Sequence, residues 1–340
     1  EAQAEARYLM LATNNLLKPQ DGKPVAVPRL DMILGSYYLT MVLDGEKGEG
    51  TYYKDVDEAI MAYENHDVTI HAKIFVRVTK QIDGKLKAGK IETSVGRIIF
   101  NQGIPQDLGF IDRKEDPFQF EINFPVMKKS MGTIIERVID KHGLTESAEV
   151  IDYIKALGYK YATLAGITYS MDDVKVPAAK KELLAEADKK IETIRKQYAR
   201  GLITNEERYE ATVNVWEDTT KEVTKAMEDN FDNLNPVYMM VKSGARGNIN
   251  QLRQIAGMRG LMAKPQKAGA EGQQIIENPI LSNFKEGLSV LEYFISSHGA
   301  RKGLADTAMK TADAGYLTRR LVDVSHDVII TEDDCGTLRG

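Results

Sequence analysis

The sequence lacks the features that mark secreted and membrane proteins. Its 340 residues include a single cysteine, which excludes an internal disulfide framework and fits a reducing compartment. No apolar run approaches the roughly 18 residues that a membrane-spanning helix needs. The opening residues, EAQAEARYLML, have no basic segment ahead of an apolar core and therefore do not predict a signal peptide. We expect a cytoplasmic protein without membrane contact.

An excess of positive charge is also absent. Lys and Arg number 45 against 50 Asp and Glu, and the formal net charge is −5. This balance excludes a nucleic-acid binder coated in positive charge, so any such contact must come from local basic stretches. With 43% hydrophobic residues, the chain has enough material for two or three domains.

The most informative stretch is residues 286–325. Its middle, residues 299–315, is dominated by Gly, Ala and Thr, and no proline occurs between residues 288 and 325. A continuous helix of about 50–55 Å is therefore possible. Two glycines, Gly303 and Gly315, would each cost about 1 kcal/mol relative to alanine. Over residues 299–320, two acidic residues, Asp306 and Asp313, are outnumbered by five basic ones: Arg301, Lys302, Lys310, Arg319 and Arg320.

Such a helix has two interpretations. Small side chains and scattered cations would let a phosphate backbone approach closely, and the glycines would let the helix bend. A small-residue helix packed tightly in a core explains the same composition equally well.

Residues 178–229 predict an antiparallel helical hairpin with a coiled-coil seam, because apolar residues recur every three or four positions in both halves. Gly201 suits the left-handed end of the first helix, and Thr204 with Glu207 suits a capping box for the second. A two-helix hairpin buries little by itself. It must therefore project from a body or dock on a partner, unless it only braces the fold.

Residues 242–264 combine glycines with cations and contain no acidic residue. Arginine binds phosphate oxygens in a bidentate manner, so the segment predicts a triphosphate contact at Arg246 and Arg253. The alternative is that Arg253 and Arg259 pair with carboxylates elsewhere, and for Arg259 this alternative is preferred.

The first 145 residues predict a β-rich, mixed α/β region. Alternation over residues 68–79 predicts a strand, Asp83-Gly84 a turn into a second strand, and residues 94–100 a third. On this pattern His71 lies on the polar face and is solvated. Helices are expected over 4–17, from Asp31 through Leu43, over 57–65, from Val126 onward and over 147–157, with a domain boundary near residue 145.

Two candidate motifs are rejected. Residues 84–90, GKLKAGK, approach a phosphate-binding loop, but Ile91 stands where Ser or Thr must bind magnesium and a strand follows, so we predict a hairpin loop. The five histidines show no metal-ligand spacing, and no Ser/His/Asp or Cys/His arrangement supports nucleophilic catalysis.

Several long motifs resemble one known family. HGARKGLADTAMKTADAGYLTRRLVDV resembles the bridge helix of the largest catalytic subunit (beta-prime) of bacterial RNA polymerase. The resemblance extends to YMMVKSGARGNINQLRQIAGMRGLMAKP (238–265), NPILSNFKEGLSVLEYFIS (278–296) and EAQAEARYLMLATNNLL (1–17). It covers essentially the whole chain, more loosely between residues 45 and 175.

The resemblance implies a multi-domain, mixed α+β middle piece of that subunit. It divides the chain into a pore-like region (1–145), a helical funnel (146–237) with its coiled-coil hairpin (178–229), an active-site-facing segment (238–285), the bridge helix (286–325) and the start of a truncated zinc-binding region (326–340).

The resemblance also implies roles for individual residues. Arg246, and Arg253 near it, would contact the incoming nucleoside triphosphate, and the hairpin tip would meet secondary-channel factors of the Gre type through Arg200, Gly201, Leu202, Ile203 and Thr204. Template DNA and the hybrid with nascent RNA would lie against Arg301, Lys302, Gly303, Thr307, Lys310, Thr311, Ala312, Gly315, Tyr316 and Arg319. The other polymerase subunits would be partners, in a bacterial cytoplasmic, nucleoid-associated enzyme.

Metal sites are implied only in part. The magnesium-binding string of the family, Asn-Ala-Asp-Phe-Asp-Gly-Asp, does not occur here, so magnesium would be held by residues outside this sequence and the chain alone would be inactive. Cys335 matches the first of four zinc ligands whose other three are missing. Since a structural zinc needs four ligands, zinc is expected only in a longer subunit.

The sequence departs from the family pattern at three places. Glu210-Ala211 stands where proteobacterial enzymes carry Asn-Lys, part of a pocket for the alarmone ppGpp. Residues 265–274 form a longer loop than the family has, and Arg29-Leu30-Asp31 replaces a more usual Ser-Gln-Asp in the nucleotide entry site.

Two functions outside the family are compatible with the same residues. The hairpin could make the chain a stand-alone interaction scaffold, recognised by hairpin-dependent capture without polymerase subunits. Residues 242–264 could serve an independent enzyme with a phosphate substrate, recognised by nucleotide binding to the isolated chain.

Overall fold

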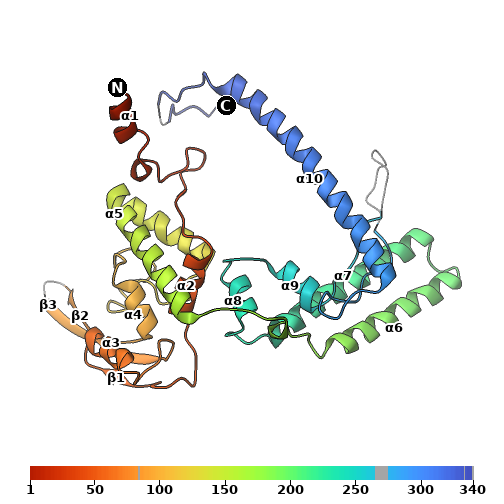
Figure 1. The fold of residues 1–340 in the computed structure, drawn as a ribbon, viewed down its shortest axis with the longest axis horizontal. Coiled ribbons are helices and arrows are strands. Elements are labelled where there is room, and N and C mark those ends of the chain that lie inside the picture. The colour runs from red at the N-terminus through yellow and green to blue at the C-terminus, as the bar shows by residue number, and fades with distance from the viewer. Residues whose placement is uncertain (83–84, 265–274, 333, 339–340) are drawn as a thin grey trace. The chain divides into compact units, whose positions relative to one another are not determined.

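The computed structural model describes residues 1–82, 85–264, 275–332 and 334–338, and it shows a mixed α and β protein (Figure 1). The chain divides into two compact units. The first comprises Glu1–Lys175 and Asp229–Leu252, and the second comprises Val176–Glu228 and Arg253–Gly340.

The first unit contains a small sheet beside a group of helices. The strands are β1 (Tyr52–Tyr53), β2 (Ile74–Ile82) and β3 (Lys85–Thr93), in the order β1-β2-β3. β1 runs parallel to β2, whereas β2 and β3 are antiparallel, with Ile74 opposite Thr93. This pairing is a β-hairpin, but the loop predicted at residues 84–90 is wrong, because residues 85–90 belong to strand β3 and pair with β2. The predicted Asp83-Gly84 turn lies outside the described residues.

The helices of the first unit are α1 (Ala2–Tyr8), α2 (Asp31–Thr40), α3 (Val56–Glu64), α4 (Val95–Asn101), α5 (Lys128–Ala165) and α8 (Pro236–Lys242), with short 3-10 turns at Ala12–Asn14 and Met171–Asp173. The predicted helix at 57–65 is confirmed within one residue as α3. Its N-terminus is capped by Asp55, whose carboxylate accepts a hydrogen bond from the Glu58 N–H at 2.9 Å.

The third predicted strand is wrong, because residues 95–101 form α4. The Ser94 hydroxyl accepts a hydrogen bond from the Arg97 N–H at 3.3 Å and so caps the helix. Val95 and Ile98, three residues apart, both enter the core beneath the sheet. The β-branched residues of this segment predicted a strand, but the cap at Ser94 and the burial of one helix face favour a helix.

The first predicted strand begins later than expected, at Ile74 rather than near residue 68. His71 is therefore not solvated on a polar strand face, as predicted, but only 5% exposed. Its ring packs edge-on against Tyr38 at 4.4 Å, and burial lowers its pKa. The error came from extending a regular alternation through residues 68–73, which form turns and a single bridge between Ala72 and Leu43.

The predicted helix at 4–17 is also shorter than expected. α1 ends at Tyr8 and the chain continues as a loop with one 3-10 turn. α1 buries no residue, and Leu9, Met10 and Leu11, which follow it, are exposed, whereas Leu16 reaches the core through the loop. An amphipathic pattern yields a long helix only where its apolar face meets a surface.

Helices α2 and α5 form the main packing contact of the first unit. At their closest approach two glycines face each other: a Cβ added to Gly35 would lie 1.8 Å from the Gly158 carbonyl oxygen. α2 ends at Thr40 rather than Leu43, and Asp31 is its first residue without a side-chain cap hydrogen bond. Leu30, just before it, has a φ of +51°, which is unusual for a branched residue.

Gly143 interrupts α5 with a φ of +75°, so the two helices predicted from Val126 and over 147–157 are the two halves of α5. Buried residues on both sides of this kink, such as Ile135 and Ile154, belong to one hydrophobic core. The boundary predicted near residue 145 therefore falls inside one compact unit.

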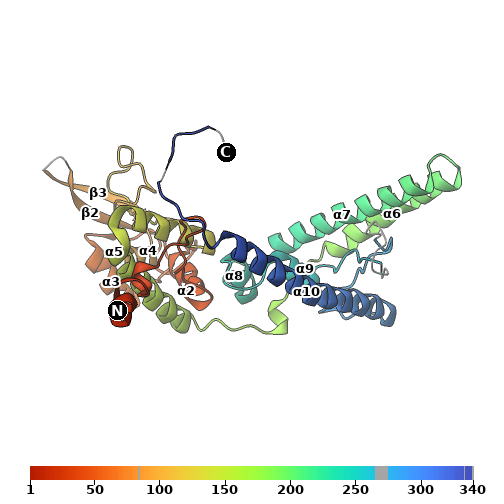
Figure 2. The ribbon, with the colours of Figure 1, turned by 90° about the horizontal axis from the view of Figure 1, so that it is seen from above.

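The second unit contains α6 (Lys180–Ala199), α7 (Asn205–Asn230) and α10 (Val290–Ser325), while α9 (Ile249–Ala256) crosses from the first unit to the second. α6 and α7 lie side by side (Figures 1 and 2) and share a core of Ala187, Ile191 and Trp216. The predicted capping box is confirmed, with the Thr204 N–H 2.7 Å from the Glu207 carboxylate and the Glu207 N–H 3.2 Å from the Thr204 hydroxyl. Gly201 has the predicted left-handed φ, +74°.

Candidate functional site

Arg246 lies in a basic pocket of the first unit. The cavity has a volume of about 390 Å³, and its lining includes three cations: Arg29, Lys128 and Arg246. All three are exposed, none forms an ion pair with a described residue, and no acidic residue lines the cavity. Three unpaired cations around a cavity of this size suit a phosphorylated ligand.

The turn that follows α8 builds one wall of this pocket. Lys128 donates its backbone N–H to the Ser243 carbonyl at 2.9 Å, which ties the start of α5 to the turn. Gly244 and Gly247 have φ values of +74° and +76°, and a Cβ on Gly244 would come within 3.0 Å of the Lys128 Cβ. Glycine is therefore required at residue 244 by its backbone conformation and by close approach.

The prediction for Arg246 placed it correctly in a basic glycine-rich segment but did not name its neighbours. Arg29 precedes α2 and Lys128 begins α5, so they lie 217 and 118 positions from Arg246 in the sequence. Only the packing of α2, α5 and α8 brings them together, through a core that joins Ile33 with Met239 and Ala245. The one available sequence signal was the departure at Arg29 from the family pattern.

Arg253 and Arg259 belong to the second unit. Burial lowers the pKa of both guanidinium groups, and the Arg253 Nε is buried without a hydrogen-bond partner. Arg259 lies over the Phe284 ring, 4.9 Å from its centroid. The carboxylate pairing preferred for Arg259 is thus absent among the described residues, and an aromatic ring takes its place.

Helix α10 is anchored at its N-terminus. The Ser289 hydroxyl and the Glu292 carboxylate form a capping box, and Ser282 also contacts the Glu292 carboxylate at 3.2 Å. Burial raises the Glu292 pKa, but the hydrogen bonds from Ser289 and Ser282 outweigh it and lower the pKa overall. Gly299 approaches Met262, where an added Cβ would lie 3.1 Å from the methyl group.

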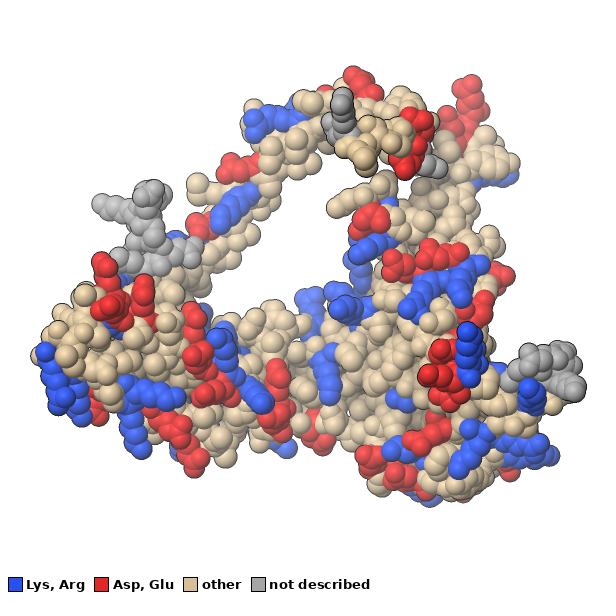
Figure 3. Space-filling model, turned by 180° about the vertical axis from the view of Figure 1, so that it is seen from behind, with Lys and Arg blue, Asp and Glu red and all other residues tan. Residues whose placement is uncertain are grey.

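Beyond this anchor, α10 is exposed. Every residue from 301 to 330 is exposed except the partly buried Lys302. A Cβ added to Gly303 or Gly315 would meet nothing within 4 Å. Figure 3 shows basic and acidic groups spaced along this rod with uncharged surface between them. The interpretation as a small-residue helix packed in its own core is therefore wrong for this half of α10.

The polar side chains of α10 are partly engaged by the helix itself. The hydroxyls of Thr307 and Thr311 donate to carbonyls four residues earlier, at 2.8 and 2.7 Å. Arg319 approaches Asp323 at 4.0 Å, an exposed pair of little energetic weight. Arg320 lies 4.4 Å from the centre of the Tyr316 ring. Arg301, Lys302 and Lys310 form no ion pair with a described residue, and Ala312 is exposed.

The hairpin tip, residues 200–204, is exposed except for the partly buried Ile203, and Leu202 is 69% exposed. Behind the tip, Arg208 forms a bidentate pair with Glu277 at 2.7 and 2.9 Å, and this hydrogen bonding lowers the Glu277 pKa. Glu210, at the departure from the family pattern, is exposed. The longer loop at 265–274 lies outside the described residues.

The described residues contain no group of three or more His, Cys, Asp or Glu side chains that could hold a metal ion. Cys335 is an exposed free thiol. No helix in the described part of the chain is both long and apolar enough to cross a membrane.

Comparison with known proteins assigns the family. Three family models match consecutive parts of the chain: RNA polymerase Rpb1 domain 3 over residues 15–174, domain 4 over 203–285 and domain 5 over 287–340. The DNA-directed RNA polymerase subunit beta' of Clostridium novyi is 57% identical over the whole chain, and that of Thermoanaerobacter pseudethanolicus is 58% identical. The chain belongs to the RNA polymerase beta' family.

This assignment confirms the resemblance of the motifs at 238–265, 278–296 and 298–324. The chain spans 28% of the length of those two beta' relatives and 29% of the beta' subunit of Acetivibrio thermocellus, which is 56% identical. Membership of the beta' family gives no support to a stand-alone hairpin scaffold. The individual site residues stay predictions.

Proposed function

We propose that this chain is part of a bacterial DNA-directed RNA polymerase, in which it lines the entry channel for nucleoside triphosphates and contacts template DNA through α10. The observation that carries the proposal is the exposure of α10 from residue 301 to residue 330 in a chain of the beta' family. A 36-residue helix that, among the described residues, is anchored only at its N-terminal end needs a partner along its length.

The composition of α10 suits a nucleic acid as that partner. Its residues from 303 to 316 are mainly Gly, Ala and Thr, which let a base pair approach closely, and exposed or partly buried cations flank them. We assign template DNA and its hybrid with nascent RNA to Gly303, Thr307, Thr311, Ala312, Gly315 and Tyr316. The phosphates would meet Arg301, Lys302, Lys310 and Arg319.

The basic pocket around Arg246 is assigned to the incoming nucleoside triphosphate. We add Arg29 and Lys128 to the nucleotide contact predicted for Arg246. Three cations around one cavity suit a polyphosphate better than a single cation does. Arg253 keeps its predicted role near the nucleotide. The exposed tip at residues 200–204 is assigned to secondary-channel factors of the Gre type, and the remaining surfaces to the other polymerase subunits in the cytoplasm.

The described residues do not fit a catalytic metal site, because no cluster of ligand side chains is present among them. Magnesium would be held by residues outside this sequence, and zinc would need three ligands in addition to Cys335. We assign to this chain a role in binding and positioning.

A photo-crosslinking experiment tests the α10 assignment. Tyr316, which is 63% exposed, is replaced by p-benzoylphenylalanine in the full-length subunit of an assembled elongation complex. We expect a crosslink to labelled template DNA. The matched control places the same residue at Tyr198, 43% exposed in the helical hairpin, and should give no template crosslink. Equal labelling from both positions, or none from residue 316, would contradict the proposal.

A substitution tests the nucleotide assignment. Arg246→Ala in the assembled polymerase should raise the KM for nucleoside triphosphates about tenfold, because a charge-assisted hydrogen bond to phosphate is lost. Single-nucleotide addition kinetics measure the effect, and Arg77→Ala, on an exposed strand face outside this pocket, serves as the control. Unchanged addition kinetics in the Arg246 variant would remove this residue from the nucleotide site.

A further inference from the structure

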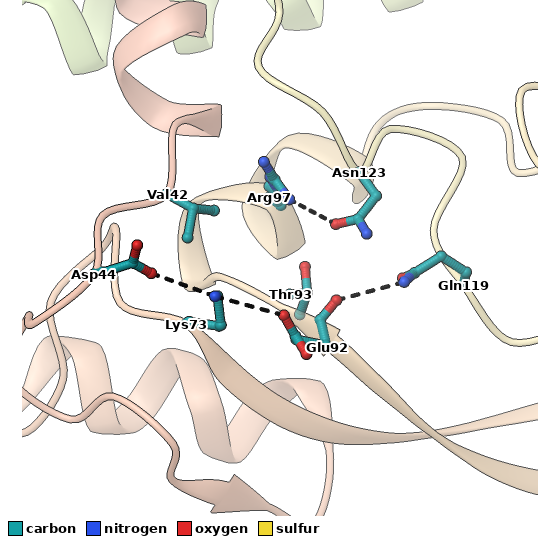
Figure 4. Close-up of a pocket in the computed structure, with 8 residues that line it drawn as sticks. All are labelled: Val42, Asp44, Lys73, Glu92, Thr93, Arg97, Gln119 and Asn123. Atoms are coloured by element: carbon teal, nitrogen blue, oxygen red, sulfur yellow. Dashed lines mark hydrogen bonds and ion pairs between the residues drawn. The ribbon is translucent and has the colours of Figure 1, made fainter. Parts of the chain in front are cut away.

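A second cavity of the first unit lies where the end of β3, the start of α4 and residues 119–123 meet (Figure 4). Its volume is about 520 Å³, within the range of small-molecule sites. Thr93, Arg97 and Asn123 form its inner wall, and Asp44, Lys73 and Glu92 stand at one side. None of these residues has a role in the function proposed above.

Arg97 provides a fixed positive charge in this cavity. Its Nε donates to the Thr40 carbonyl and its Nη1 to the Asn123 Oδ1, both at 2.9 Å, so the guanidinium group is held in place. Burial lowers the Arg97 pKa, although the nearby charge of Glu92 favours the protonated form. No carboxylate forms an ion pair with Arg97 among the described residues. A half-buried guanidinium without an anion is costly, and an anion in the cavity would stabilise it.

Thr93 provides the second, independent sign of a missing ligand. The side chain is only 2% exposed, and its hydroxyl oxygen is buried without a hydrogen-bond partner. Figure 4 shows this hydroxyl pointing into the space between Arg97 and Gln119. Buried hydroxyls are almost always hydrogen-bonded, so this orphan donor requires an explanation.

Asn123 provides a third donor. Because its Oδ1 accepts from Arg97, its amide nitrogen is the atom left to face the cavity, as Figure 4 shows. The inner wall therefore offers the remaining N–H groups of Arg97 and the Asn123 amide as donors, and the Thr93 hydroxyl, which can also donate. A ligand group with several lone pairs can accept hydrogen bonds from all three side chains.

The charges at the side of the cavity limit what that acceptor can be. Lys73 lies 3.3 Å from the Asp44 carboxylate and 3.9 Å from the Glu92 carboxylate, so its charge is already matched. The two cations of the lining, Arg97 and Lys73, balance its two carboxylates, Asp44 and Glu92, so the lining carries no net charge. A dianion would be repelled by Asp44 and Glu92, whereas a single negative charge on Arg97 is tolerated.

We propose that this cavity is a binding site for a small molecule that carries one carboxylate group, held by Arg97, Thr93 and Asn123. The carboxylate offers two oxygens with about four lone-pair directions to the three donors. The remaining volume accommodates a neutral or positively charged remainder of the ligand next to Asp44 and Glu92.

The test uses acetate and methyl phosphate as probes, observed by saturation-transfer difference NMR on the full-length protein in its native complex. Acetate is expected to give a saturable signal and to bind more tightly than methyl phosphate. Thr93→Val keeps the shape of the side chain and removes one hydrogen bond, so the acetate Kd should rise about fivefold. The matched control is Thr69→Val, which removes another buried hydroxyl without a partner, outside this cavity, and should leave the Kd unchanged.

A second variant keeps the proposal testable if Thr93→Val disturbs the fold. Asn123→Asp retains the acceptor for Arg97 and places a carboxylate inside the cavity, so it should abolish acetate binding. The absence of a saturable acetate signal, expected if another polypeptide segment fills the cavity, would overturn the proposal. So would acetate binding that both variants leave unchanged, or tighter binding of methyl phosphate that Thr93→Val weakens.

Discussion

Helices α5 and α10 have nearly the same length, 38 and 36 residues, but opposite surroundings. α5 is kinked at Gly143 and places residues along both halves in the core of the first unit. α10 is unbroken and buries only Ser296. The stability of α5 thus comes from packing within this chain, whereas α10 depends on its cap, its helix propensity and surfaces outside this chain.

The largest expected contrast between the two helices comes from truncating an aliphatic side chain in each. Ile154 of α5 is fully buried, so Ile154→Ala should lower the free energy of unfolding by about 4 kcal/mol through lost contacts and a cavity. Leu304 of α10 is 75% exposed, so Leu304→Ala should change it by less than about 0.5 kcal/mol. Urea denaturation of this chain measures both. Similar losses would mean that α10 packs on this chain after all.

A glycine in each helix gives the next contrast. A Cβ on Gly158 of α5 would lie 2.5 Å from the Met32 carbonyl oxygen, so Gly158→Ala should cost about 3 kcal/mol. Gly303 of α10 has free space, so Gly303→Ala should stabilise the helix by about 1 kcal/mol. Thermal unfolding distinguishes these opposite signs. In an assembled polymerase, Gly303→Ala should in addition change pausing or translocation, and a loss of stability in this variant would contradict the exposure of α10.

The smallest effect concerns the cap of α10. Glu292→Ala should lower helix stability by about 0.5 kcal/mol at pH 7, because the carboxylate interacts with free N–H groups of the first turn. The folded pKa of Glu292 lies below its ordinary value of 4.5, so this contribution is present above pH 4.5 and is lost as the pH falls through the folded pKa. Circular dichroism of both proteins between pH 7 and pH 3 tests this. Asp306→Ala, which removes a carboxylate from the exposed middle of α10 and leaves the cap intact, is the matched control.

Local chemistry made parts of the fold predictable. The Thr204–Glu207 capping box and the left-handed Gly201 follow from three or four neighbouring residues, and both are present. The prediction of a strand at 94–100 was wrong because two local signals compete there. The β-branched residues favour a strand, whereas Ser94 favours the start of a helix. The prediction that His71 is solvated was wrong because its burial depends on contact with Tyr38, which lies far away in the sequence.

The candidate site likewise contains one residue that local sequence predicts and others that only the packing of helices reveals. Arg246 stands in a segment whose composition alone indicates phosphate binding. Arg29 and Lys128 reach its pocket only because α2 and α5 pack together through Gly35 and Gly158, which no local pattern reveals. The cavity lined by Thr93, Arg97 and Asn123 could not be predicted from the sequence. A hydroxyl such as that of Thr93 can be recognised as unpaired only when the positions of all its neighbours are known.

The threonines of α10 have a consequence for motion. Since Thr307, Thr311 and Thr318 already donate their protons to carbonyls one turn back, they offer an approaching partner methyl groups and acceptor lone pairs but no hydroxyl donor. A ligand that advances along this helix breaks no directional bond with them and meets a surface of nearly uniform energy. This helix face therefore gives a moving nucleic acid no fixed stopping points. Stepwise pauses in its movement would come from contacts with the cations beside this face or from bending of α10.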